Sequence, residues 1–223
     1  WIFGVILSDV PPDSPEDTEQ IGTLAAGNAV VDHVVFSPDG TLLAQTVGSG
    51  IVAVYDTAMQ EPVIRYEMPS LQGTGLAFSP RGRYLAAASG FPSTAVSVFD
   101  LEDDTTDPAY ILDAESATVT GLVFLPADND TLPTLTAIDD AGGLRLWQID
   151  DEATIIGETE VEEAWLLDVA VNPAGDLLAT TSLAGQITLW DISDSTTPQM
   201  LTLLQDDGEP VHDITFSPDG TLI

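Results

Sequence analysis

Two histidines and a large number of carboxylates are the residues of this sequence that could take part in chemistry. His33 and His212 lie three and four residues before Phe36 and Phe216, so alternation directs them to opposite faces of equivalent strands. The sequence contains no nucleophile elbow and no glycine-rich loop of the kind that holds phosphates. We therefore assign no catalytic residue and expect a protein that is not an enzyme.

The carboxylates are interpreted as solvated loop residues rather than as metal ligands. They gather in short runs, for example at residues 100–104 and 150–152. Residues 128–130 have the start of a calcium-loop spacing, but the glycine and the closing glutamate that such a loop requires are missing. The chain has no cysteine, which removes thiolate metal sites and disulfides. The sequence predicts neither a metal nor a cofactor.

The strong acidity of the chain restricts its partners. Against 37 acidic residues there are 4 arginines and no lysine, which gives a formal net charge of −33. Binding to nucleic acid or to an anionic membrane surface requires a basic patch, so both partners are excluded. The apolar share of 44% is ordinary for a folded protein, and we expect the body of the chain not to insert into a membrane. The charge is interpreted as a means of keeping the surface hydrated, with recruitment of a basic partner as the alternative.

A repeat of about 45 residues organises the chain, and the elements of this repeat must hold the residues named above. The turn at residues 36–42, Phe-Ser-Pro-Asp-Gly-Thr-Leu, returns at residues 216–222. The prolines of five related turns are separated by 42, 46, 47 and 45 residues; they are Pro38, Pro80, Pro126, Pro173 and Pro218. In phase with them, four alternating apolar segments end on Tyr55, Phe99, Trp147 and Trp190. This period-2 alternation predicts four strands in each repeat.

A single four-stranded unit cannot bury both of its faces, so we expect the units to stack as the blades of a propeller. The predicted fold is all-β, a β-propeller of four-stranded antiparallel blades, with four complete blades and partial blades at the ends. The propeller is expected to span residues 21–223. Its blades are expected near residues 31–68, 73–115, 118–160 and 166–205, with a partial blade at 211–223.

The Phe-Ser-Pro-Asp-Gly turns and the two tryptophan endings resemble the Trp-Asp (WD40) repeat β-propeller family. Two features of that family are missing. No Gly-His pair precedes the first strands, and the structural aspartate six residues before the tryptophan is replaced by Ser49, Ser93, Ala141 and Ala184. We therefore expect aliphatic packing instead of the buried Asp-His-Ser-Trp hydrogen-bond network that the resemblance implies. The resemblance also implies a non-catalytic scaffold that binds proteins or peptides.

Residues 1–20 are expected to be a partial strand or a linker. Val5, Leu7 and Ser8-Asp9 fit the ending of a further blade, whereas the acidic, proline-rich residues 9–19 suit a linker after an anchor or export segment. The second alternative favours an exported or membrane-anchored protein over a cytoplasmic one. Four blades are few for this family, so we expect a fragment of a longer chain, prokaryotic by its composition, that self-associates through open blade faces.

The candidate binding site lies on the top face, where the resemblance places the connections that enter each first strand. Trp165 has no equivalent in the other repeats, and Phe91 lies in a loop expected on the same face. We expect these aromatics to anchor a protein or peptide, with a charged rim of Glu162, Glu163, Asp206 and Asp207. One alternative is a propeller that regulates or docks an enzymatic module, such as a kinase or peptidase, outside this segment. A lactonase-type propeller enzyme is the other.

Overall fold

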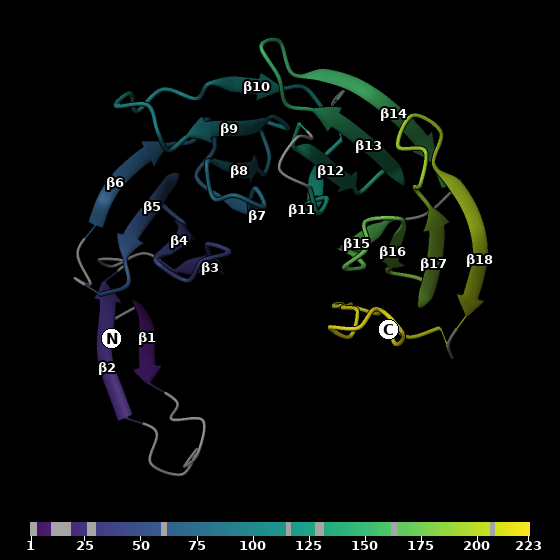
Figure 1. Ribbon diagram of the computed structural model, residues 1–223, viewed down its shortest axis with the longest axis horizontal. Helices are drawn as coiled ribbons and strands as arrows, with labels where there is room; N and C mark the ends of the chain where they lie inside the picture. Colours follow the sequence, from purple (N-terminus) through teal and green to yellow (C-terminus); the bar gives the residue numbers. More distant parts are fainter. Residues whose placement is uncertain are drawn as a thin grey trace.

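Four antiparallel sheets of four strands each form the body of the protein in a computed structural model, which describes residues 4–9, 19–25, 30–58, 62–114, 117–127, 132–161, 165–205 and 208–223. In each sheet the strands pair in chain order. Figure 1 shows the sheets side by side along an arc, each with its first strand on the inner side and its fourth on the outer side. This arrangement confirms the predicted all-β fold of four-stranded blades.

The strands of the four blades are short and similar in length. Blade 1 consists of β3 (Val31–Phe36), β4 (Leu42–Val47), β5 (Ile51–Asp56) and β6 (Pro62–Glu67). Blade 2 consists of β7 (Gly73–Phe78), β8 (Tyr84–Ser89), β9 (Val96–Asp100) and β10 (Tyr110–Leu112). Blade 3 consists of β11 (Val119–Phe124), β12 (Thr134–Asp139), β13 (Gly143–Gln148) and β14 (Thr154–Glu160). Blade 4 consists of β15 (Leu166–Val171), β16 (Leu177–Ser182), β17 (Gln186–Asp191) and β18 (Gln199–Gln205).

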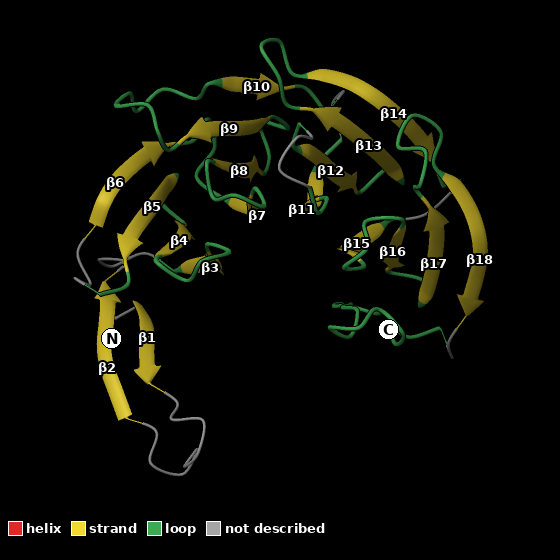
Figure 2. Cartoon of the chain, viewed as in Figure 1, coloured by secondary structure: helices red, strands yellow, loops and turns green. Residues whose placement is uncertain are grey.

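No helix occurs among the described residues, as the colouring of Figure 2 shows, so this part of the chain contains no helix that could cross a membrane. Ahead of blade 1, β1 (Gly4–Asp9) and β2 (Glu19–Ala25) form an antiparallel hairpin. At the other end, residues 208–223 lie beside blade 4, where the N–H of Ile214 donates to the Asp168 carboxylate at 2.9 Å.

Apolar side chains from facing sheets make the cores between successive blades. Between blades 1 and 2, the rings of Tyr66 and Phe99 stack with their centroids 4.0 Å apart. Burial raises the pKa of the Tyr66 phenol to about 12. Phe78 of blade 2 is buried against blade 1, whereas its counterpart Phe36 is 53% exposed on the opposite side of blade 1. Our expectation of self-association through such faces stays a prediction.

Blades 1 and 4 each contain a polar bond inside the apolar core. In blade 4 the indole Nε1 of Trp190 donates to Thr180 Oγ1 at 3.0 Å, and in blade 1 Gln45 Nε2 donates to Tyr55 Oη at the same distance. The position of Thr180 is occupied by alanine in blades 2 and 3, which leaves no side-chain acceptor there. The family network is therefore reduced to single bonds rather than wholly lost, and aliphatic packing accounts for the rest of each core.

The Ser-Pro-Asp-Gly turns between first and second strands are fixed by their own side chains. In the turn at residues 37–42, Ser37 Oγ donates to Asp39 at 2.6 Å and accepts the N–H of Leu42 at 2.9 Å. Gly40 has a φ of 72°, a conformation in which most side chains are strained. The turn at residues 217–222 repeats these bonds with Ser217 and Asp219. The two turns thus carry carboxylates that act purely as hydrogen-bond acceptors.

These bonds predict an acid-sensitive turn. The Ser217 hydroxyl, with further bonds from Thr221, lowers the pKa of Asp219 to about 2, and Ser37 and Thr41 lower the pKa of Asp39 in the same way. Because the folded pKa lies below the unfolded value of about 3.9, the turn's contribution is present above that value and is lost as pH falls toward 2. We expect Ser217→Ala to raise the pKa of Asp219, measured by NMR titration of the carboxyl carbon. An unchanged pKa would contradict the assigned cause.

Like-charge repulsion leads to an expected dependence of stability on salt. With 37 acids and 4 arginines, few acids find a cation, and the pairs formed by Arg83 with Asp100 and by Arg145 with Asp139 are among them. The Debye length falls from about 10 Å at 0.1 M salt to about 3 Å at 1 M. We expect the melting temperature to rise over this range, by about 2–4 °C for each kcal/mol gained. A flat or falling melting temperature in calorimetry would refute the repulsion argument.

Candidate functional site

Strand direction gathers two kinds of loop on one face of the protein, which we call the top face. First and third strands start there, while second and fourth strands end there, so it contains the connections between blades and the turns between second and third strands. Trp165 immediately precedes β15, and Phe91 follows β8. Topology therefore brings both aromatics to the same face, although blade 3 separates the blades that carry them.

A backbone hydrogen bond recurs on the top face of every blade. The N–H of a residue just after the second strand donates to the carbonyl of the residue just before the first strand, over 2.8 to 3.0 Å. The four donor–acceptor pairs are Gly48 to Val30, Gly90 to Gln72, Asp140 to Thr118, and Leu183 to Trp165. We call this contact the top-face bridge. It shows that Trp165 does have equivalents in the other repeats, contrary to the sequence-based interpretation, although none of them is aromatic.

Blade 4 is the only described blade whose bridge carries two large apolar side chains. Trp165 is 52% exposed and Leu183 is 44% exposed, whereas the corresponding pairs in the other blades contain a glycine or are polar. The bridge uses backbone atoms alone, so neither side chain is needed to form it. These two side chains are therefore available for contact with another molecule.

A second apolar pair lies on the top face of blade 2. Phe91 is 85% exposed and Leu71, in the connection from blade 1, is 72% exposed. Ser70 Oγ donates to the Phe91 carbonyl at 3.2 Å, and the N–H of Gly90 donates to the Gln72 carbonyl, so the two loops are fastened together. The backbone thus holds Phe91 and Leu71 in neighbouring loops while both side chains remain in solvent.

Leu71 and Leu183 were missed from the sequence, because a lone leucine in a loop interrupts no periodic pattern. Their only signal was an apolar residue among turn residues, at Ser70-Leu71-Gln72 and at Ser182-Leu183-Ala184. Of the predicted rim, Glu162, Glu163, Asp206 and Asp207 lie outside the described residues. The acidic rim stays a prediction.

Acidic and basic groups of the top face of blade 3 are already engaged. Asp139 is 1% exposed; its carboxylate pairs with Arg145 Nη1 at 2.5 Å and accepts the N–H of Gly143 at 2.7 Å. The neighbouring Asp140 carboxylate accepts the N–H of Thr118 at 2.9 Å and reinforces the bridge of that blade. These side chains shape the loop and make the top face of blade 3 polar, between the apolar pairs of blades 2 and 4.

Both histidines are exposed, His33 on β3 and His212 after β18. Desolvation by the surrounding residues lowers the pKa of His33, against the opposing charges of Asp32 and Asp168. Burial raises the pKa of Asp168, although the N–H of Ile214 favours its charged form. Within the described ranges, no group of three or more histidine or acidic side chains is placed to hold a metal ion. His33 lines an open hollow at the inner strands, together with residues such as Asp32, Thr74 and Thr120.

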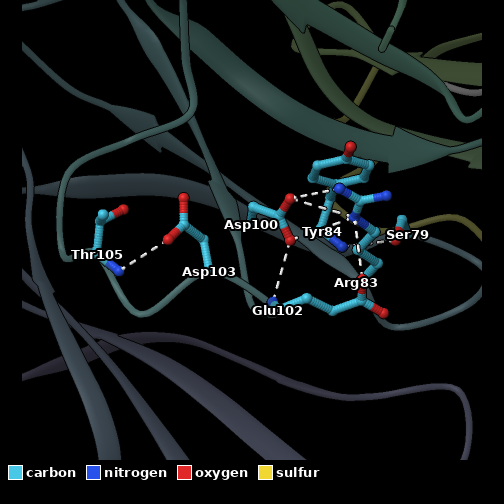
Figure 3. A network of polar contacts seen from close by, with 7 residues as sticks. All are labelled: Ser79, Arg83, Tyr84, Asp100, Glu102, Asp103 and Thr105. Carbon is cyan, nitrogen blue, oxygen red and sulfur yellow. Dashed lines mark hydrogen bonds and ion pairs between the residues drawn. The ribbon is translucent and has the colours of Figure 1, made fainter. Parts of the chain in front are cut away.

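On the opposite face, an ion-pair network joins the ends of β8 and β9. Arg83 Nη2 contacts Asp100 Oδ2 at 2.7 Å, and Arg83 Nε lies 3.5 Å from Glu102. Figure 3 shows this network beside the Tyr84 ring, whose centroid is 4.9 Å from the guanidinium carbon. Arg83 lowers the pKa of Asp100 by this hydrogen bond. The network fixes the edge of blade 2 that faces blade 3.

Comparison with known proteins agrees with this architecture. The family model described as WD domain, G-beta repeat matches residues 154–191, which run from β14 through β15 and β16 to the end of β17. WD repeat-containing protein 55 from Pongo abelii and its counterpart from Rattus norvegicus are each 29% identical over 188 residues, covering 81% of this chain. Telomerase protein component 1 from Rattus norvegicus is 27% identical over 150 residues, or 67% of this chain.

Residues 154–191 thus contain a WD40 repeat, and the chain as a whole is similar to WD-repeat proteins. The matched WD40 repeat starts in the outer strand of blade 3 and ends on Trp190-Asp191 of blade 4, so one sequence repeat spans two structural blades. The chain spans 44% of the length of each WD repeat-containing protein 55 and 5% of telomerase protein component 1. WD40 proteins generally serve as scaffolds that bind other proteins and are typically not enzymes.

Proposed function

We propose that this chain is a non-catalytic WD40 scaffold that binds a protein or peptide through its top-face loops. The observation that supports the proposal is the exposure of two apolar pairs, Trp165 with Leu183 and Phe91 with Leu71, on loops fastened by backbone bonds. Rigid loops bearing exposed aromatics bind at a low cost in conformational entropy. Trp165 and Phe91 act as the apolar anchors in this proposal.

The acids next to these anchors complete the proposed site. Glu162 and Glu163 precede Trp165 in the connection between blades 3 and 4, and Asp206 and Asp207 follow β18 in the next connection. A charged rim of this kind raises the rate of association with a basic partner and contributes less to the final affinity than a buried anchor. A partner that pairs an apolar side chain with basic residues fits this composition.

The test begins with peptides selected from a randomised display library on the immobilised protein. The affinity of a selected peptide is then measured by calorimetry for Trp165→Ala, for Phe91→Ala and for the control Ile111→Ala, whose side chain is 64% exposed on the outer strand β10. Anchors of this type cost about 2 kcal/mol or more when truncated, so we expect Trp165→Ala to weaken binding at least tenfold. The melting temperature should stay nearly unchanged, because the bridge of Trp165 uses only its carbonyl.

Equal affinities for Trp165→Ala, Phe91→Ala and the wild-type protein would refute the top-face proposal. An equally large loss of affinity in the Ile111→Ala control would also refute the proposal, since that result would place the peptide on the outer strand of blade 2. If Trp165→Ala unfolds the protein, Trp165 belongs to the core and its assignment as an anchor is wrong.

A further inference from the structure

A groove on the face opposite the top face separates blades 2 and 3. It has a volume of about 490 Å³. Two irregularities of the repeat occur in the blades that form it. The outer strand β10 has only three residues, and the chain between β11 and β12 in blade 3 is longer than the compact turns of the other blades. Residues of both blades line it together, among them Arg83, Tyr84 and Tyr110 from blade 2 and Leu132, Asp150 and Asp151 from blade 3.

The floor of this inter-blade groove is apolar and rigid. Tyr84 is 8% exposed and meets Tyr110 edge to face with ring centroids 6.4 Å apart. Across the groove Ile149 is fully buried, and Leu132 is 48% exposed at its mouth. A side chain laid along this floor would bury apolar surface against residues that the core already holds in place.

The two walls differ in charge. On the blade 2 wall, Arg83 is engaged by Asp100 and Glu102, and this neutralises the positive charge nearest the floor. On the blade 3 wall, Asp150 and Asp151 form no ion pair with any described residue. The Asp150 carboxylate is oriented by the N–H of Glu152, which donates to it at 3.0 Å. The groove therefore presents an apolar floor beside two carboxylates that form no ion pair within the described part of the chain.

We propose that this inter-blade groove binds a short basic segment of a partner protein, in which an arginine or lysine stands next to an apolar residue. The aliphatic stem of the basic side chain lies over Leu132 and Tyr110, and its cationic head contacts Asp150 and Asp151. Long basic side chains bury their methylene groups on apolar surface while the charged head stays at the polar edge. A charge-assisted hydrogen bond to a carboxylate is about twice as strong as a neutral one.

The charges of the groove also set the direction of the bound segment. Asp150 and Asp151 line the blade 3 side, so the basic residue of the segment belongs at that side. The net charge of −33 adds a long-range attraction for any cation, and this attraction must be separated from specific binding in the test. The site is independent of the top-face site, because it lies at the opposite ends of the strands.

The experiment titrates the full chain by calorimetry with a six-residue peptide that alternates leucine and arginine. A peptide with glutamate in place of arginine is the ligand control. The paired substitution Asp150→Asn with Asp151→Asn is expected to weaken binding at least tenfold, which corresponds to about 1.4 kcal/mol. The matched control is Asp103→Asn with Asp104→Asn, in the equivalent connection of blade 2, which lies outside the groove. This control removes the same amount of charge. It also removes one turn-capping carboxylate, since Asp103 accepts the N–H of Thr105.

A second variant tests the floor without changing charge. Leu132→Ala should weaken binding of the arginine peptide, and this loss should persist at 0.5 M salt, where screening removes most of the long-range attraction. Equal losses in the two asparagine pairs would overturn the proposal, because binding would then follow net charge alone. Binding of the glutamate peptide as tight as that of the arginine peptide would overturn it, because the groove would then not recognise positive charge. Loss of binding in Trp165→Ala would assign the peptide to the top face instead.

Discussion

Alanine in place of Trp190 should lower the free energy of unfolding by about 3–5 kcal/mol, the range for truncating a large aromatic residue in a core. Trp190 is 3% exposed and packs between blades 3 and 4, in a cluster with residues such as Leu146, Leu166 and Leu178. The substitution also takes away the indole donor of Thr180 Oγ1, which is buried. A cavity and a lost hydrogen bond then act on the same interface.

Urea denaturation followed by circular dichroism measures this loss, with Trp165→Ala as the control. Both variants remove one tryptophan, yet only Trp190 is inside a core, so the control should lose less than about 0.5 kcal/mol. Because each blade contacts only its neighbours, the weakened interface should also open locally, which hydrogen exchange in β15 to β17 would detect. Equal losses in the two variants would show that Trp165 is buried in solution.

Alanine in place of Gly157 is the second substitution with a large expected effect. Gly157 is buried in the outer strand β14, and a Cβ atom built there would overlap the backbone carbonyl oxygen of Ser195 and crowd Pro198. These two residues belong to the connection between β17 and β18, which packs against β14 of the preceding blade. A backbone carbonyl cannot rotate away as a side chain can, so the connection must move. We expect a loss of about 1–3 kcal/mol, the usual cost of overpacking.

The matched control for Gly157→Ala is Gly48→Ala. At Gly48 an added Cβ atom meets its nearest neighbour, the Val30 carbonyl oxygen, at 3.7 Å, an ordinary contact. Thermal melts of both variants should therefore separate by several degrees, with Gly48→Ala near the wild-type value. If Gly157→Ala melts with the wild-type protein, the connection at residues 195–198 does not pack against β14 in solution.

The architecture could be predicted because related turn sequences recur in each repeat. The proline spacing and the alternating segments that end on Tyr55, Phe99, Trp147 and Trp190 are local signals, and each corresponds to one turn or strand of the structure. Exposure of Trp165 and Phe91 could be anticipated for a related reason, since aromatics in the loops break a pattern that is otherwise regular.

Contacts between distant residues could not be predicted in this way. The pair of Arg83 with Asp100 spans 17 residues, and the inter-blade groove joins Tyr84 and Tyr110 to Ile149 of the next blade. Neither has a fixed sequence spacing. The Arg83–Asp100 pair depends on the register between β8 and β9, and the groove depends on how one sheet is placed against its neighbour. The bond from Trp190 to Thr180 was missed because the family pattern directed attention to aspartate and histidine, whereas a threonine on the neighbouring strand provides the acceptor.

In the top-face bridge, backbone atoms hold the loops together, and the side chains at the same positions remain available for recognition in the proposed site. Since main-chain atoms form it in all four blades, Val30, Gln72, Thr118 and Trp165 can occupy one position with the same geometry. In the proposed top-face site, a point mutation at one of these positions can therefore change specificity at almost no cost in folding free energy. Each bridge is in effect an interchangeable display position, and a designer could graft a chosen residue onto each blade and alter its binding preference independently of its neighbours.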